Sequence, residues 1–284
     1  MSLNKSCIVL QTHIDNYDPA GNLTLEQRRF IVDLSIKQLR WYNPNDYIIV
    51  TGHGVVEPSE DAKSYCNHFM WESIAPQMDN GQVKGMPAQY YYVSKGIKYA
   101  KQKGFTHILK TRGDTLIGVP NILEYCEDVI SKENTKMLLT QQTGWEKFKM
   151  GDCFIFGETD LMDKIWDMDN KVMDLDGLVN TGIHFLEYFT NDITIQNYVK
   201  HLKQYCSFRD LINIKFACTR WNYHTLDKIG WDTVVNQIKS KEFNFNQFHW
   251  GKTNNFHQFD LNGNMIHSHL PFYYFEKSYY NLEN

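Results

Sequence analysis

The sequence predicts an α/β protein in which one mostly parallel sheet is flanked by helices on both faces. Short buried apolar segments alternate with helical segments over residues 1–165, which is the pattern of repeated strand–helix units. The 284 residues, of which 42% are hydrophobic, suffice for one substantial core. In such sheets ligands bind at the carboxyl ends of the strands, so the residues that follow each strand are the first candidates for a site.

Five apolar runs predict the strands, and the segments between them carry the helical signals. The strands are expected at 6–14, 46–51, 106–110, 136–140 and 153–156. The helices are expected at 23–42 with Asn22 or Thr24 as cap, at 59–69, at 87–102 with a stop at Gly104, at 119–130 and at 158–168.

The last third of the chain has a different character. Residues 174–240 are expected to be helical and irregular, and residues 241–284 are rich in aromatic side chains. Because disordered segments are poor in aromatics, we expect this tail to wrap on the same core. No repeat or linker divides the chain, which predicts a single domain over 1–284 with an α/β core at 1–165 and further elements at 166–284.

Composition and charge exclude several classes of protein. The net charge of −4 and the absence of a long basic run argue against nucleic-acid binding, but they allow a local positive pocket for one phosphorylated ligand. No run approaches the ~18 consecutive apolar residues of a membrane span, so at most a peripheral membrane contact is expected. The six cysteines are widely spaced, which favours buried, reduced thiols in a cytoplasmic protein over disulfides or zinc.

Charged residues follow the third predicted strand directly. Lys110, Arg112 and Asp114 stand at its carboxyl end, on the ligand side of a parallel sheet. Asp114 is a candidate ligand for a divalent cation bound to a diphosphate, and the two cationic side chains suit phosphate. An ion pair between Arg112 and Asp114 explains the same spacing equally well.

The helix before that strand has a glycine in its middle. Gly96 costs ~1 kcal/mol relative to alanine there, which indicates close approach of a strand or a ligand. Packing of the helix on the sheet is the favoured cause. Ser94 and Lys95, which precede it, are included among the candidate nucleotide- or phosphate-binding residues.

Two further carboxylates and a histidine are candidates. Asp152 precedes an apolar strand and could bind a sugar hydroxyl, although a turn residue is an equal alternative. Glu187 lies among aromatics and could act as a base, although an exposed helical glutamate is the safer interpretation. His269, one of several late histidines, is a candidate metal ligand, against the commoner alternative of a surface or core histidine.

Three stretches together resemble one family of enzymes. They are YYYVSKGIKYAKQKGFTHILKTRGDTLI, MGDCFIFGETDLMDKIW and GIHFLEYF, which together cover about residues 86–190. In this order they resemble the WavE-type glycosyltransferases of lipopolysaccharide synthesis. The tail after residue 190 does not match the family's pattern.

The resemblance implies a GT-A-like fold, with a single Rossmann-type sheet, and a glycosyltransferase that uses a nucleotide-sugar donor. The acceptor would be a glycan or glycolipid, in the synthesis of surface polysaccharide or lipopolysaccharide. That fold commonly holds the diphosphate through Mn²⁺ or Mg²⁺ bound by an Asp-x-Asp motif. Here Arg112 stands where the first aspartate would be, so Asp114 alone is left as the direct ligand and Arg112 could partly replace the charge of a cation.

These considerations assign a role to each candidate residue. Asp114, with His269 as a further metal candidate, would hold the cation, and Glu187 and Asp152 would be the base and the sugar-binding residue. Nucleotide and phosphate contacts are expected from Gln11, Thr12, Gly52, His53, Ser94, Lys95, Lys110 and Arg112.

Two other functions stay open. A sugar nucleotidyltransferase would use a similar sheet, but it should carry a glycine-rich loop after the first strand, where this chain has Thr12-His13-Ile14-Asp15-Asn16. A non-catalytic carbohydrate-binding protein would keep the fold and the aromatic residues without binding a nucleotide.

Overall fold

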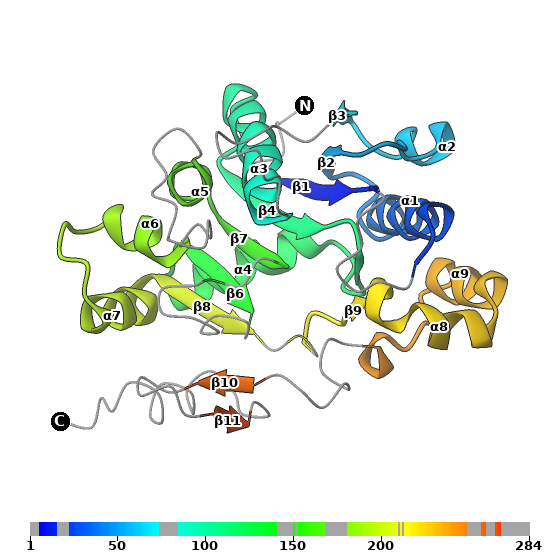
Figure 1. Cartoon of the computed structure of the whole chain (residues 1–284). Coiled ribbons are helices and arrows are strands. Elements are labelled where there is room, and N and C mark those ends of the chain that lie inside the picture. Colours follow the sequence, from blue (N-terminus) through cyan, green and yellow to red (C-terminus); the bar gives the residue numbers. More distant parts are fainter. Residues whose placement is uncertain are drawn as a thin grey trace.

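Buried strands form the centre of the protein in the computed structural model, where they build one sheet with helices on both faces (Figure 1). The expected fold class is therefore confirmed. The structure describes residues 6–15, 23–73, 85–140, 150, 153–167, 181–209, 211, 213–248, 257–259 and 265–267.

The central sheet has seven strands in the order β3-β2-β1-β4-β7-β6-β8. They are β1 (Ser6–His13), β2 (Tyr47–His53), β3 (His68–Glu72), β4 (His107–Arg112), β6 (Met137–Thr140), β7 (Phe154–Glu158) and β8 (Cys206–Arg209). Neighbouring strands are parallel except that β7 is antiparallel to both β4 and β6. The mostly parallel sheet was expected, whereas the reversed direction of β7 was not.

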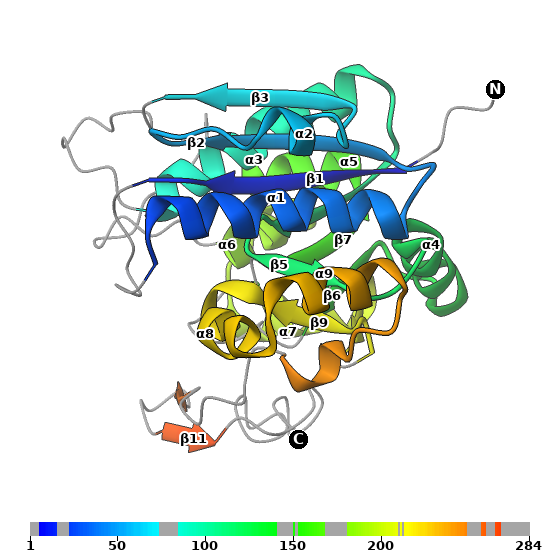
Figure 2. The ribbon, with the colours of Figure 1, turned by 90° about the vertical axis from the view of Figure 1, so that its right-hand side faces the viewer.

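Each face of the sheet packs against its own set of helices. On one face, Val9 of β1 packs with α3 (Gly85–Gln102) and α5 (Thr159–Trp166). On the other, Leu10 packs with α1 (Leu25–Tyr42) and α4 (Ile122–Glu133). Because successive side chains of a strand point to opposite faces, β1 contributes to both cores. Figure 2 shows α1 lying along the strands, with β1 and β3 pointing the same way, and β2 is parallel to both.

Local sequence explains how α1 begins and why α3 lies close to the sheet. Thr24, one of the two expected caps, accepts a hydrogen bond from the backbone of Gln27, whose side chain accepts from the backbone of Thr24 in return. A Cβ added to Gly96 of α3 would lie 2.6 Å from Cγ1 of Val9. The expected close approach at Gly96 is confirmed, and the neighbour is a strand.

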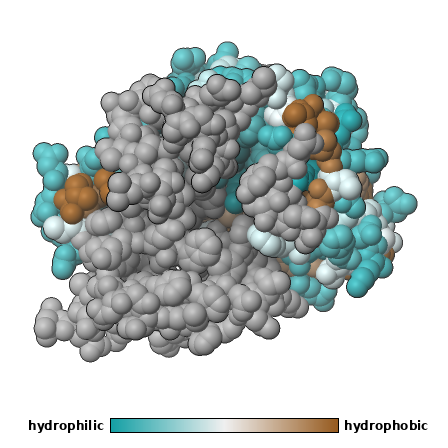
Figure 3. All heavy atoms as spheres, in the orientation of Figure 1, coloured by the Kyte–Doolittle hydropathy of each residue, from teal (hydrophilic) through white to brown (hydrophobic). Residues whose placement is uncertain are grey.

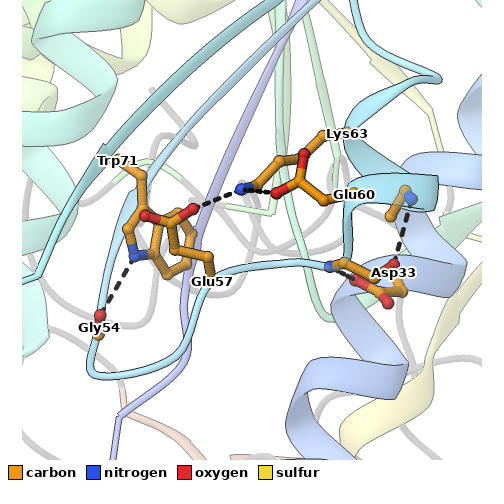
Figure 4. Close-up of polar contacts among 8 residues, drawn as sticks. Asp33, Gly54, Glu57, Glu60, Lys63 and Trp71 are labelled. Carbon is orange, nitrogen blue, oxygen red and sulfur yellow. Dashed lines mark hydrogen bonds and ion pairs between the residues drawn. The ribbon is translucent and has the colours of Figure 1, made fainter.

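The helix expected at 59–69 is wrong in its second half. Helix α2 covers only Glu60–Lys63, and the chain then forms β3 at the edge of the sheet. Figure 4 shows that this connection is held by polar contacts: Lys63 pairs with Glu57 and Glu60, and Trp71 Nε1 donates to the carbonyl of Gly54 at 3.1 Å. These contacts fix the chain where it leaves the carboxyl end of β2.

The expectation of helical and irregular structure at 174–240 missed two strands. The helices there are α6 (Thr181–Glu187), α7 (Ile195–Tyr205), α8 (Thr219–Ile229) and α9 (Trp231–Lys239). Strand β8 joins the central sheet, while β9 (Phe216–Cys218) pairs antiparallel with β5 (Thr115–Ile117), a short strand directly after β4 that was also not expected. The late strands β10 (His257–Phe259) and β11 (Met265–His267) form a separate antiparallel pair.

Part of the aromatic tail packs on the core, as expected. Phe243, Phe245 and Phe248, around the 3-10 helix η1 (Phe245–Gln247), pack with Leu34 and Tyr42 of α1. All six cysteines are free thiols, and all but Cys66 are buried. None of the described helices combines the length and the apolar character needed to cross a membrane.

Candidate active site

The strand order places a topological switch point between β1 and β4. The chain builds β2 and β3 on one side of β1 and then returns to place β4 on the other side. Ligands bind in open α/β sheets at the carboxyl ends of the two strands where this reversal occurs. Gln11 of β1 pairs there with Arg112 of β4, and the backbone N–H of Gly113 donates to the carbonyl of Gln11 at 2.9 Å.

Arg112 and Asp114 form a bidentate ion pair at this edge. Arg112 Nε lies 2.9 Å from Oδ1 of Asp114, and Nη2 lies 2.6 Å from Oδ2. Their side chains are only 17% and 16% exposed. Burial by itself raises the pKa of Asp114, but the adjacent guanidinium outweighs burial and lowers it. The ion pair that the sequence left as an alternative is therefore present.

A tight turn positions this pair. Thr115 Oγ1 donates to the carbonyl of Arg112 at 2.7 Å, which closes the turn between β4 and β5. Gly113 lies against the side chain of Thr12, and a Cβ at this position would overlap the Thr12 hydroxyl. Thr12, an expected site residue, is thus a packing neighbour that brings the ends of β1 and β4 together.

Helix α8 brings a second arginine to the same place. The backbone N–H and Oγ1 of Thr219 both donate to the carbonyl of Asp114, at 3.0 and 2.9 Å. Arg220, the next residue, is partly buried, and its charge helps to lower the pKa values of both Asp114 and His13. Sequence reasoning missed Arg220 because no local motif links it to β4.

Aromatic and imidazole rings line the neighbouring end of β2. His13 and His53 stack at 5.7 Å between centroids, and His53 stacks on Tyr92 of α3 at 4.9 Å. The Tyr92 hydroxyl donates to Glu72, which also pairs with Lys95. Apart from His53 and Lys95, these residues were not expected in a site.

Both histidines are neutral at pH 7. Burial is the main cause that lowers the pKa of His13 to about 4, and it also lowers the pKa of His53. His53 is 6% exposed, and its Nδ1 has no hydrogen-bond partner among the described residues. A buried polar atom without a partner is costly, so this nitrogen marks a position where a ligand could donate or accept.

Three other expected residues are buried in packing contacts. Lys110 is fully buried, with Nζ 4.9 Å from the ring centroid of Trp166 of α5, so it is enclosed on the α5 face of the sheet. Ser94 is buried in α3. Gly52 is pressed between the carbonyl of Thr12 and the ring of Trp71.

Glu187 belongs to a cluster at the end of α6. Its carboxylate lies 3.1 Å from Lys164 Nζ and 3.2 Å from His184 Nδ1. Burial raises its pKa, but the hydrogen bonds from these two residues outweigh burial and lower it. Asp152 and His269, the other two candidates, lie outside the described residues.

The described residues alone do not make a good site for a divalent cation. No three histidine, cysteine, aspartate or glutamate side chains gather within the part of the chain that the structure describes. Asp114 offers a carboxylate, but both of its oxygens already accept from Arg112. Mg²⁺ and Mn²⁺ prefer several oxygen ligands, and Asp114 alone would offer a carboxylate that is already paired.

The surface over the described residues is mainly hydrophilic on the face shown in Figure 3, with hydrophobic surface confined to small separate groups. The exposed large hydrophobic residues in the described segments are Val55, Tyr188, Ile193, Trp221 and Ile229. Single exposed hydrophobic residues are normal on soluble surfaces and do not mark a docking site. The peripheral membrane contact expected from the sequence stays a prediction.

Comparison with known proteins gives similarity in structure only. No family model and no curated protein matches the chain. A cytidylyltransferase from Leptospira borgpetersenii is 13% identical with a TM-score of 0.44, and the match covers 86% of this chain and 91% of that one. A glycosyltransferase involved in glycosylation of the major capsid of PBCV-1 is 13% identical with a TM-score of 0.39, covering 72% and 82%.

A third solved structure, a putative nucleotide-diphospho-sugar transferase from Desulfovibrio desulfuricans G20, is 9% identical with a TM-score of 0.37. That match covers 73% of this chain and 80% of that one. Similarities at these levels assign no activity to this chain.

Proposed function

We propose that this protein is a glycosyltransferase that uses a nucleotide-sugar donor. The observation that carries the proposal is the position of Arg112, Asp114 and Arg220, which meet at the switch point between β1 and β4. This is the place where an α/β sheet binds a nucleotide or its phosphates. Two guanidinium groups against one carboxylate give this edge a local positive charge inside a chain of net charge −4.

The chemistry of glycosyl transfer needs such a charge. The acceptor oxygen forms a bond to the anomeric carbon, while the bond from that carbon to the diphosphate breaks. The leaving nucleoside diphosphate takes the electron pair, so fixed positive groups near it stabilise the transition state. Arginine suits this role because its planar fork donates two hydrogen bonds to phosphate oxygens.

The nucleoside would bind beside this cluster, over the ends of β1 and β2. Gln11, His53 and Lys95 lie on the strands and helix that border it, and the buried Nδ1 atom of His53 has no hydrogen-bond partner in the part of the chain that the structure describes. Thr12, Gly52, Ser94 and Lys110 would act by packing around the site, because each is buried against neighbouring residues.

The remaining roles are also proposals. Asp152 would bind the donor sugar, and Glu187, which is ionised at neutral pH, would take the proton of the acceptor hydroxyl. The acceptor would be a glycan or glycolipid, and the narrower WavE-type role in surface polysaccharide synthesis rests on the three sequence stretches alone. From the sequence, Asp114 and His269 are the candidate ligands of Mn²⁺ or Mg²⁺, and the comparison of binding with Mn²⁺ and with a chelator tests whether the site requires such a cation.

Nucleotide binding and donor hydrolysis test the proposal. The protein is screened by thermal shift with UDP, GDP, CMP and TDP, each with Mn²⁺ and with a chelator. The nucleotide that stabilises it then selects the sugar donors whose hydrolysis is measured. We expect stabilisation by one nucleoside diphosphate and slow release of free sugar from its donor.

Two results would replace the proposal by an alternative. Release of pyrophosphate from a nucleoside triphosphate and a sugar 1-phosphate would make the protein a nucleotidyltransferase. Stabilisation by oligosaccharides with none by any nucleotide would make it a carbohydrate-binding protein.

A further inference from the structure

We infer that Arg112 and Arg220 together neutralise the bound diphosphate in place of a divalent cation, and that Asp114 orients Arg112 instead of ligating a metal. Arg220 would then be a phosphate-binding residue, although it lies on α8, far from β4 in the sequence. This assignment rests on the proposed function, because it specifies how the same site would hold its diphosphate.

Asp114 is fixed by hydrogen bonds to both its carboxylate and its backbone carbonyl. Its two carboxylate oxygens accept from Nε and Nη2 of Arg112, and its backbone carbonyl accepts both hydrogen bonds from Thr219. Bidentate pairs of this kind fix the plane of the guanidinium. Asp114 therefore sets the direction of Arg112 and ties the start of α8 to the end of β4.

The hydrogen bonds from Thr219 to Asp114 bring Arg220 close to the Arg112–Asp114 pair. Arg220 follows Thr219 in the first turn of α8, an 11-residue helix, and it is partly buried. Its guanidinium carbon lies 5.8 Å from the ring centroid of Trp221. Its charge is felt at Asp114 and at His13, which belongs to β1. Arg220 therefore lies within electrostatic range of the ends of both β1 and β4.

Positively charged side chains outnumber negatively charged ones among Arg112, Arg220 and Asp114. The guanidinium groups of Arg112 and Arg220 oppose one carboxylate, and His13 and His53 are neutral at pH 7. The ionised side chains of Arg112, Arg220 and Asp114 therefore sum to a charge of +1. A divalent cation at Asp114 would be repelled by both arginines, whereas a diphosphate would be attracted by them.

Replacing Arg112 by a metal ion at the carboxylate of Asp114 would cost free energy. A cation that ligated Asp114 would displace the guanidinium from the carboxylate, and a side chain that is 17% exposed would lose its charged partner. Separating a largely buried pair in this way is strongly unfavourable. A diphosphate can bind Arg112 and Arg220 without breaking the pair, since each guanidinium has five N–H donors.

Calorimetric titration tests the inference with the nucleoside diphosphate found in the screen, the matching monophosphate and inorganic pyrophosphate. The proteins are the wild type, Arg220→Gln, Arg220→Lys and Lys228→Gln. Lys228→Gln is the matched control, because it removes one positive charge from the exposed last turn of the same helix. Circular dichroism and thermal unfolding confirm that each variant folds.

We expect the wild type to bind the diphosphate with less than about threefold difference between Mn²⁺ and a chelator. Arg220→Gln should weaken diphosphate binding by about 10- to 100-fold, the effect of losing charge-assisted hydrogen bonds, and it should change monophosphate binding far less. Arg220→Lys should be intermediate, and Lys228→Gln should match the wild type.

Binding that needs Mn²⁺ would overturn the inference and leave the proposed function standing. Unchanged diphosphate binding in Arg220→Gln would also overturn the inference and leave the proposed function standing. If Arg220→Gln does not fold, wild-type affinity for the diphosphate in Arg220→Lys would show that the planar guanidinium of Arg220 is not needed, and would likewise overturn the inference. Pyrophosphate binding that depends on Arg220, without binding of any nucleotide, would support the two-arginine site and overturn the transferase. A wild type that binds neither ligand would overturn both.

Discussion

At the scale of single residues, the Arg112–Asp114 pair should contribute measurably to stability. Both side chains are largely buried, so solvent screens their attraction less than that of a surface pair. We expect Arg112→Gln and Asp114→Asn each to destabilise the protein by about 1–3 kcal/mol, and the double variant by clearly less than the sum. Urea unfolding of the three variants and the wild type measures the coupling energy.

An exposed pair provides the matched control for that cycle. Lys132 and Asp128 lie one turn apart on α4, at 2.7 Å, with side chains that are 74% and 55% exposed. Their coupling should be about 0.3–0.5 kcal/mol, as for other exposed helical pairs. If the Arg112–Asp114 and Lys132–Asp128 pairs gave equal coupling energies, Asp114 would not be the residue that holds Arg112 in place.

Glu187 gives a prediction about pH. Its folded-state pKa is lowered below the ordinary value of 4.5, so its ion pair with Lys164 and its hydrogen bond with His184 stabilise the protein fully above about pH 5.5. This contribution is lost as the pH falls through 4.5 and then below the folded pKa. The wild type should therefore exceed Glu187→Gln in unfolding free energy at pH 7, and this advantage should be smaller at about pH 3.5, below the ordinary pKa of a glutamate.

Urea unfolding at the two pH values checks this expectation. A difference that persisted unchanged at the lower pH would contradict it. The same variant also tests the proposed base, because sugar transfer at the wild-type rate in Glu187→Gln would leave the carboxylate with a structural role only.

The site residues show how far single residues can be predicted from sequence. Arg112 and Asp114 were found because they directly follow an apolar strand, and chain order alone puts them at its carboxyl end. Arg220 could not be found in this way, because the contacts that bring it there join residues 105 positions apart. His13 and Glu72 were missed because an imidazole or carboxylate at the end of a strand becomes a site residue only through its neighbours.

At the scale of elements, the fit between α3 and the sheet depends on Gly96. Alanine there would normally stabilise a helix by ~1 kcal/mol, but its Cβ would lie 2.6 Å from Val9 Cγ1 and 3.0 Å from Thr51 Cγ2. We expect Gly96→Ala to destabilise the wild type by about 1–2 kcal/mol through overpacking. In a Val9→Ala background, where that γ-methyl is gone, the same change should be neutral or stabilising.

Thermal or urea unfolding of Val9→Ala, Gly96→Ala and the double variant measures this reversal. The same loss in both backgrounds would mean that Val9 is not the residue that limits the approach of α3.

The elements that sequence analysis missed share a physical cause. β5 and β9 have three residues each and β8 has four, which is too short for a periodic pattern. The five residues of β3 are all only partly buried because the strand lies at the edge of the sheet. Long strands and helices with a strong apolar pattern were found, whereas the reversed direction of β7 depends on its neighbours and leaves no mark on its own sequence.

At the scale of the whole molecule, the site joins parts of the chain that lie far apart in the sequence. The ends of β1 and β4 come from the first half, whereas β9 and α8, which hold β5 and Asp114 in place, come from the last third. The proposed site is therefore complete only when the late elements are docked. A ligand that binds both arginines should stabilise this docking as well as the strand ends.

Hydrogen–deuterium exchange with and without the nucleoside diphosphate tests that linkage. At a ligand concentration of 100 times Kd, binding stabilises the native state by about 2.7 kcal/mol. We expect slower exchange at short labelling times in two separate peptides, one with the amide of Gly113 and one with the amide of Thr219, because these N–H groups bridge β1, β4 and α8. Peptides from α7 should change little, since its described core contacts are with α6 and β8 at the other side of the sheet. Protection of the Gly113 peptide without the Thr219 peptide would show that α8 takes no part in binding, and the ligand would then be held by the strand ends alone.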